Sequence, residues 1–214
     1  MLNELFNIQN RIVSNISLNF KRYIYKEINW KNRMIIMTGA RGTGKTTLVL
    51  QYFLEKYNDI TKCLYISADN PLVLKYGIYN IVSEYFKYYG DCLIIDEIHK
   101  QKNWSLEIKA LCDAWPDRHF IILGRPTLNI IFEKGDLSRR SVIYSLHPLS
   151  FREYLELKYQ KQLPIMNFDQ LVSDHVKISG ELSSQFKTIL GDFNDFLITG
   201  SYPFFTEYNS NYYN

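Results

Sequence analysis

The chain has 214 residues, of which 46% are apolar and 22% charged, and its 25 basic and 22 acidic residues give a formal net charge of +3. This composition excludes a mainly disordered chain, and the 10 Gly and 6 Pro residues, which follow no period, exclude a collagen-like one. The longest apolar runs are far shorter than the roughly 20 residues that a membrane-spanning helix needs.

The first predicted element is an amino-terminal helix. Apolar residues recur every three or four positions from Leu5 to Tyr23, so about the first 25 residues should form a helix with one buried face. The amino terminus has no basic stretch followed by an apolar one. We therefore expect no secretory signal and a cytoplasmic protein.

Five short apolar or β-branched runs follow, separated by stretches long enough for helices. The expected strands are Met34–Thr38, Cys63–Ser67, Cys92–Ile95, Phe120–Leu123 and Val142–Leu146. The expected helices are Lys45–Tyr57, Leu72–Tyr89, Asn103–Trp115, a short one at Leu128–Phe132, and then Ser150–Tyr159 and Phe168–Leu190. Parallel neighbours need crossover connections, so the alternation predicts an α/β fold with a five-stranded parallel sheet and helices on both faces.

Cysteine and histidine spacings give no sign of a metal site. The three cysteines form no C-x-x-C pair, and Cys63 and Cys92 lie in expected strands, so we expect buried free thiols. The four histidines are too scattered to share one ion, and no structural zinc is expected.

The strongest motif of the chain is a phosphate-binding loop. The pattern G-x-x-x-x-G-K-[ST] is matched, directly after the first expected strand, by Gly39, Ala40, Arg41, Gly42, Thr43, Gly44, Lys45 and Thr46, with Thr47 following. Its glycines let successive N–H groups point inward, and a helix that begins near Lys45 adds about +0.5 charge. We expect residues 39–47 to hold a nucleotide polyphosphate, with Lys45 on the β- and γ-phosphates and the Thr46 hydroxyl on Mg²⁺. Arg41 is expected to be a solvated or phosphate-side charge rather than a catalytic one.

Two carboxylates end the third expected strand. Asp96 and Glu97 follow a buried run, at the edge where ligands bind in open α/β sheets. Asp96 should hold Mg²⁺ through its water shell, and Glu97 should polarise the attacking water. In isolation this pair would be interpreted as loop or helix-start charges, but the phosphate loop upstream favours a site. The sequence contains no Asn-Lys-x-Asp, which disfavours guanine-specific proteins.

Two further features allow two interpretations each. His99 follows the acidic pair closely enough to touch the site, although a surface histidine is the simpler explanation. Aromatic residues between Tyr76 and Tyr89 flank a lysine and could stack on bases, but their helical spacing favours core packing.

Four segments, in this order, resemble the prokaryotic AAA+-like ATPases of the AAA_14 type. They are Met34–Leu48, Leu93–Lys100 with Asn103-Trp104, Leu137–Arg140, and Leu149–Leu155. The resemblance implies a P-loop ATPase domain over residues 1–160 with the sheet order 5-1-4-3-2. It also implies that residues 161–214 are a helical extension that begins a truncated carboxyl-terminal region.

The resemblance also implies ATP and Mg²⁺ as cofactors, and an arginine before the fifth strand that reaches a neighbouring subunit's γ-phosphate. Arg139 is preferred over Arg140 for this role, and the alternative for either is a solvated charge at a helix end. The expected partners are ATP, further copies of the chain, and a protein or DNA molecule on which the ATPase acts. No membrane partner is expected.

The chain departs from the resemblance after the fourth strand. Relatives tend to have Gly-Ser-Ser there, whereas this chain has Gly124-Arg125-Pro126-Thr127, so the small hydroxyl that helps orient water is absent or displaced to Thr127. Three functions are considered. The first is an Mg²⁺-dependent ATP hydrolase with Lys45, Glu97 and Arg139 as catalytic residues, and the alternative is a nucleotide-gated interaction module that binds ATP with little turnover. A DNA-binding protein that uses ATP incidentally is a third, supported only by the mild basicity.

Overall fold

The computed structural model describes residues 1–128, 137, 139–186, 188–199 and 201–207. The chain forms two compact units, Met1–His147 and Pro148–Asn214, and each is described by itself. The sequence places a boundary after residue 160, whereas helix α7 (Phe151–Tyr159) belongs to the second unit. The reason is that α7 packs against α9 (Ile189–Thr199).

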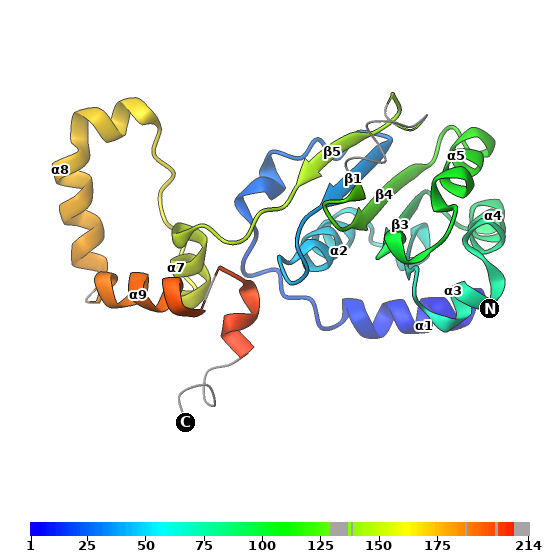
Figure 1. Ribbon diagram of the computed structural model, residues 1–214, viewed down its shortest axis with the longest axis horizontal. Coiled ribbons are helices and arrows are strands. Elements are labelled where there is room, and N and C mark those ends of the chain that lie inside the picture. Colours follow the sequence, from blue (N-terminus) through cyan, green and yellow to red (C-terminus); the bar gives the residue numbers. More distant parts are fainter. Residues whose placement is uncertain (129–136, 138, 187, 200, 208–214) are drawn as a thin grey trace. The chain divides into compact units, whose positions relative to one another are not determined.

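A five-stranded sheet forms the centre of the first unit (Figure 1). Its strands are β1 (Met34–Thr38), β2 (Cys63–Ser67), β3 (Cys92–Asp96), β4 (His119–Gly124) and β5 (Val142–Ser145). They lie in the order β2-β3-β4-β1-β5, and every neighbouring pair is parallel. This confirms the α/β fold and the predicted sheet order. In a parallel sheet all carboxyl ends meet at one edge, so the loops after β1, β3 and β4 are brought together.

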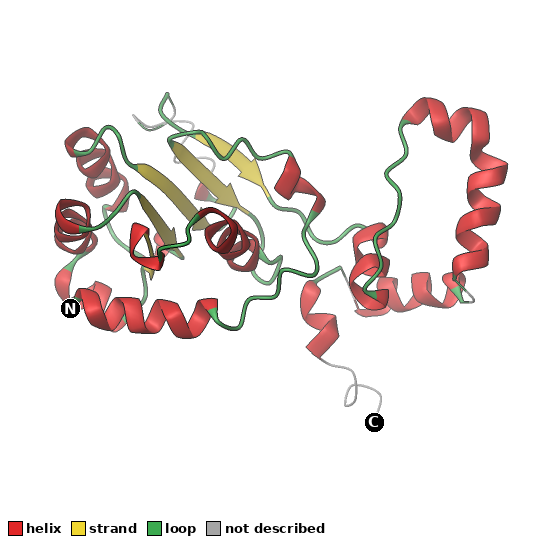
Figure 2. Ribbon diagram, turned by 180° about the vertical axis from the view of Figure 1, so that it is seen from behind, coloured by secondary structure: helices red, strands yellow, loops and turns green. Residues whose placement is uncertain are grey.

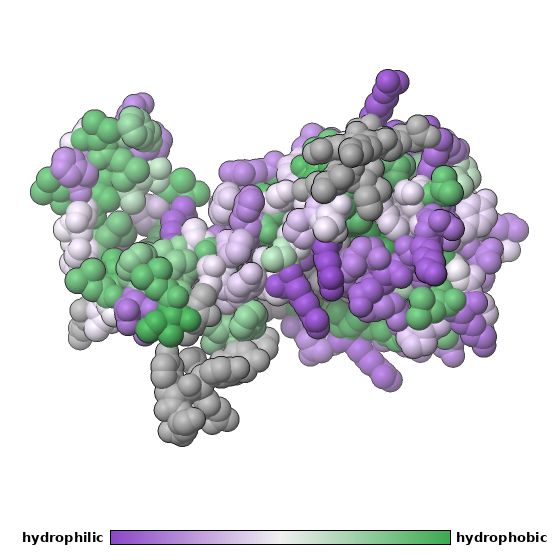
Figure 3. Space-filling view, in the orientation of Figure 1, coloured by the Kyte–Doolittle hydropathy of each residue, from purple (hydrophilic) through white to green (hydrophobic). Residues whose placement is uncertain are grey.

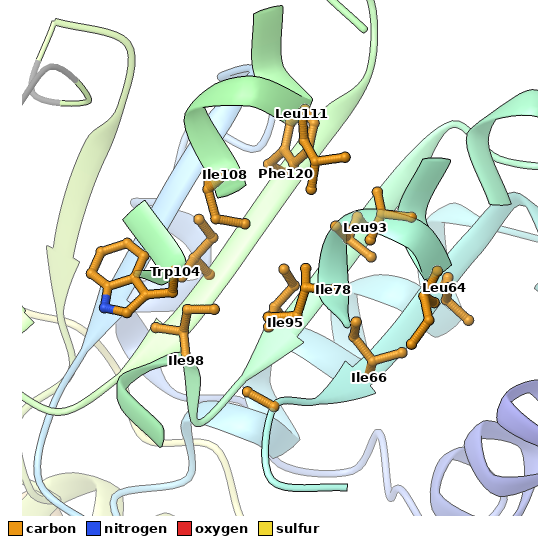
Figure 4. Packing of buried hydrophobic residues seen from close by; sticks show 14 of the residues in the cluster. Leu64, Ile66, Ile78, Leu93, Ile95, Ile98, Trp104, Ile108, Leu111 and Phe120 are labelled. Atoms are coloured by element: carbon orange, nitrogen blue, oxygen red, sulfur yellow. The ribbon is translucent and has the colours of Figure 1, made fainter. Parts of the chain in front are cut away.

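Helices cover both faces of this sheet (Figure 2). In the described part of the first unit the α-helices are α1 (Leu2–Val13), α2 (Lys45–Lys56), α3 (Pro71–Tyr76), α4 (Ile78–Tyr88) and α5 (Trp104–Ala114). Successive strand side chains point to opposite faces and build two cores. On one face Leu93 and Phe120 pack with side chains of α4 and α5 (Figure 4). On the other face Ile94 and Ile121 pack with α2.

The amino-terminal helix is shorter than predicted. A helix over about the first 25 residues is wrong, because α1 ends at Val13. The side chains of Ser14 and Asn15 donate to the carbonyl of Arg11 (3.0 and 2.8 Å), which competes with continuation of the helix. The segment that follows lies against α2, where Gln51 Nε2 donates to two of its carbonyls at 2.7 and 2.8 Å.

The predicted helix over Leu72–Tyr89 is also wrong as a single element. It is divided into α3 and α4 by Gly77, whose φ of 80° and ψ of 146° lie outside the helical region. In α4, Tyr85 and Phe86 are buried in the core, as the packing interpretation predicts. Tyr79 and Tyr88 are exposed.

The described part of the second unit contains α7, α8 (Phe168–Gln185), α9 and a short 3₁₀ turn at Pro203–Glu207. The helix predicted over Phe168–Leu190 ends early because Phe186 is extended and its ring is buried. None of the residues of α8 is buried, and apolar side chains lie on the surface of this unit in Figure 3. Of the helix predicted at Leu128–Phe132, all residues after Leu128 lie outside the described part of the chain.

Within the described residues, no helix has both the length and the apolar character that a bilayer-spanning segment requires.

Candidate functional site

The phosphate loop joins the buried strand β1 to helix α2. Gly42 and Gly44 have φ values of 84° and 89°, in the left-handed region that favours glycine, so the loop can curl back on itself. Of the loop residues, Gly39, Thr43 and Lys45 are buried, Ala40, Gly44 and Thr46 are half-buried, and Arg41, Gly42 and Thr47 are exposed. Because the loop connects the end of β1 to the start of α2, the free N–H groups of the first turn of α2 lie at the carboxyl edge of the sheet, where they can bind an anion.

The Lys45 side chain folds over the loop that precedes it. Its ammonium donates to the carbonyls of Gly39 (2.9 Å) and Ala40 (2.8 Å). Burial lowers the pKa of Lys45, and the negative charges of Asp96 and Glu97 oppose that shift. The loop thus holds a desolvated cation at the place where the motif predicts the β- and γ-phosphates.

Asp96 lies at the end of β3 and meets the phosphate loop. The Thr46 hydroxyl donates to Asp96 Oδ2 at 2.5 Å, across 50 residues of sequence. The same oxygen accepts a hydrogen bond from the Tyr65 hydroxyl (3.2 Å), and Oδ1 accepts one from the Glu97 N–H (2.7 Å). The two motifs predicted to share one site are therefore in direct contact.

A hydroxyl and a carboxylate form an oxygen pair that suits Mg²⁺ together with phosphate oxygens and water. Thr46 would hold the ion through its hydroxyl, and Asp96, which accepts the hydrogen bond of that hydroxyl, would hold it through the water shell of the ion. The described residues contain no cluster of three or more His, Cys, Asp or Glu side chains that could hold a metal alone. The residues present fit a magnesium ion that brings phosphate ligands with it.

Glu97 occupies an unusual backbone conformation at the edge of this site. Its φ of 51° lies in the left-handed region, which is costly for a residue with a side chain. Its carboxylate is about one third exposed, and Oε2 lies 3.1 Å from His99 Nε2 without the alignment of a hydrogen bond. Burial lowers the pKa of His99, and Glu97 opposes this shift. His99 therefore touches the acidic pair.

Arg125 follows β4, which lies between the strand of the phosphate loop and the strand of the acidic pair. Thr38 pairs with Gly124 in the sheet, so the chain after Gly124 leaves the sheet beside the start of the loop. Arg125, Pro126 and Thr127 are exposed. The Arg125 charge contributes to lowering the pKa of both Lys45 and His99, which indicates that it faces the same site.

The arginines before β5 lie elsewhere. β5 is parallel to β1, so Arg139 and Arg140 are at the amino edge of the sheet, opposite the phosphate loop. Arg140 pairs with Asp113, near the end of α5, and Arg139 is exposed. The fold therefore does not bring Arg139 to the site of its own chain.

Sequence reasoning missed Arg22 and Tyr65. The guanidinium of Arg22 is buried and donates to the carbonyls of Thr43 (2.7 Å) and His147 (2.8 Å). Arg22 follows Lys21 in a segment of mixed polar and apolar residues, which is typical of solvated charges, so the sequence contained no distinct signal for its role. Tyr65 offered no signal, because an aromatic residue in a buried strand is ordinary core.

The family model described as an AAA domain matches residues 31–155, more than half of the chain. An uncharacterized protein of Methanocaldococcus jannaschii is 27% identical over 196 residues, which cover 84% of this chain and 40% of that relative. The chain thus spans about two fifths of the length of this curated relative.

Solved structures resemble the chain at low identity. A DNA replication initiation factor has 15% identity and a TM-score of 0.46, with 92% of this chain and 62% of the other covered. DnaA from Aquifex aeolicus with bound AMPPCP has 18% identity and a TM-score of 0.44, with 88% and 64% covered. The chain spans less than two thirds of either structure.

Proposed function

This chain belongs to the AAA domain family of P-loop NTPases, and from that membership we propose that it binds ATP with Mg²⁺ and hydrolyses the β–γ phosphate bond. The observation that carries this proposal is the hydrogen bond between Thr46 and Asp96, which unites the phosphate loop and the acidic pair in one site.

The proposed roles follow from the chemistry of each group. The amides of residues 39–47 and the Lys45 ammonium bind the phosphates, and Lys45 stabilises the negative charge that develops during transfer. Thr46 and Asp96 hold Mg²⁺, which when bound neutralises charge on the β- and γ-phosphate oxygens. Glu97, at the partly exposed rim, orients the attacking water and accepts its proton.

A second candidate is a module that binds ATP but scarcely hydrolyses it. It is favoured by the residues after β4, where Arg125 and Pro126 replace a small hydroxyl beside the acidic pair. A long cation at this place can bind the γ-phosphate without orienting water. Tight ATP binding without phosphate release, unchanged by added protein or DNA, would favour this candidate.

Further partners follow from the position of Arg139. Since it lies at the opposite edge of the sheet from its own site, a catalytic role requires the γ-phosphate of another copy, and we propose a homo-oligomer. We also propose that the ATPase acts on a protein or on DNA. If the chain binds DNA through its phosphates, the DNA affinity should fall steeply as the salt concentration rises. An affinity that does not depend on salt concentration would exclude DNA as the partner.

Thermal unfolding with nucleotides tests the proposal. ATP with Mg²⁺ at about 100 times its Kd should stabilise the chain by about 2.7 kcal/mol, which raises Tm by about 5 °C or more. A chelator should remove most of this shift, ADP should reproduce part of it, and GTP should give little. Equal shifts with GTP, or no shift with MgATP, would contradict the proposal.

A further inference from the structure

Arg22 contacts the phosphate loop from outside the motif. It lies in the segment between α1 and β1, and only 4% of its surface is exposed. Its two terminal nitrogens reach carbonyls that are far apart in sequence, Nη1 to Thr43 inside the loop and Nη2 to His147 just after β5. The guanidinium therefore fixes the middle of the loop against the carboxyl end of the neighbouring strand.

The bond to Thr43 determines the direction of an amide. The carbonyl of Thr43 and the N–H of Gly44 belong to one trans peptide plane, in which C=O and N–H point in opposite directions. Holding this carbonyl on Arg22 directs the Gly44 N–H to the opposite side of the loop. Gly44 is also the residue that precedes α2, and its φ of 89° needs a glycine. The Arg22 side chain thus holds the carbonyl of this peptide from outside the loop.

We propose that Arg22 is a positioning residue for nucleotide binding, which aims the Gly44 amide at the phosphates through its hold on the Thr43 carbonyl. The inference rests on the proposed binding of ATP by this loop. Arg22 does not touch the reacting atoms. In loops of this kind the backbone amides cradle the α- and β-phosphates, whereas the lysine serves the β- and γ-phosphates.

Because the amides and the lysine bind different phosphates, the inference predicts a specific pattern of ATP and ADP affinities. Both ATP and ADP carry α- and β-phosphates, so loss of an amide that binds these groups lowers the affinity for ATP and for ADP by the same factor. A charge-assisted hydrogen bond corresponds to an effect of about tenfold or more on a binding constant. We expect Arg22→Met to weaken MgATP and MgADP equally, by about tenfold. Arg22→Lys should recover part of the affinity, because one ammonium can reach one of the two carbonyls.

Gln51→Met is the matched control. Gln51 is buried in α2 and, as Arg22 does, donates to backbone carbonyls, here those of Ser17 and Phe20 in the segment that contains Arg22. It makes none to the phosphate loop within the described chain. Its replacement should lower Tm but leave the affinity for both nucleotides within about twofold of wild type.

Calorimetric titration of the full chain with MgATP and MgADP, at a temperature where each variant is folded, decides the inference. Nucleotide affinity that is unchanged in Arg22→Met, or lowered equally in Gln51→Met, would overturn it. A loss confined to ATP would also overturn it. If Arg22→Met does not fold, Arg22→Lys is titrated in its place. Nucleotide affinity in Arg22→Lys equal to that of the wild type would then overturn the inference. A wild-type chain that binds neither nucleotide would refute the proposed function, and the inference that rests on it would fail as well.

Discussion

Replacement of Lys45 by alanine is expected to weaken binding of MgATP at least about 100-fold, which corresponds to about 3 kcal/mol. The Lys45 ammonium lies within the loop, held by the carbonyls of Gly39 and Ala40. Its desolvation is already part of the folded state, so a phosphate gains an unscreened cation without a further desolvation cost. Calorimetric titration measures the loss directly.

The control for Lys45→Ala is Lys56→Ala, at the other end of the same helix. Lys56 is exposed, and its removal should change MgATP affinity by less than about twofold.

Burial lowers the pKa of Lys45, so the charged form is lost at a lower pH than in an exposed lysine. The wild-type affinity should therefore fall as pH rises through that pKa, and Lys45→Ala should lack this loss. Affinity within threefold of wild type would contradict the role of Lys45.

Glu97→Gln is expected to lower ATP turnover by about 100-fold or more while MgATP still binds, because general base catalysis contributes about 10²–10⁴-fold. The amide keeps the shape of the side chain but cannot accept the proton of the attacking water. The Glu97 carboxylate is about one third exposed, so water can reach it. Phosphate release under saturating MgATP is the measurement.

Two further variants separate chemistry from folding. Glu84→Gln removes an exposed carboxylate on α4 and should leave turnover unchanged. Glu97→Gly should abolish turnover with little change in Tm. Glycine removes the strain of the left-handed backbone, which stabilises the folded chain, but it also increases the conformational entropy of the unfolded chain, and the two effects offset each other. Equal turnover in wild type and Glu97→Gln would remove Glu97 from the mechanism. Tight binding with no wild-type turnover would favour the module that only binds ATP.

The sequence was sufficient where local chemistry and topology agree. The five strands follow from buried apolar runs, and each observed strand lies within one residue of its predicted bounds. The meeting of Thr46 with Asp96 was predictable because parallel strands deliver their carboxyl ends to one edge of the sheet. No knowledge of side-chain packing was needed for either result.

The sequence was insufficient where a tertiary contact decides the outcome. The end of α1 at Val13 depends on side chains of Ser14 and Asn15 that compete with the backbone, although the apolar spacing continues. The role of Arg22 depends on carbonyls that lie 21 and 125 residues away along the chain. Periodicity describes one segment at a time and carries no information on such partners.

A double-mutant cycle of Thr46→Ala and Asp96→Asn, with MgATP affinity measured in all four proteins, tests most directly whether these two residues serve one metal-bound triphosphate. If both oxygens hold the same Mg²⁺, the second substitution should cost little after the first, with a coupling of about 1 kcal/mol or more. A chelator should then equalise the four affinities. Losses that simply add, or affinities that differ as much without Mg²⁺ as with it, would contradict the account.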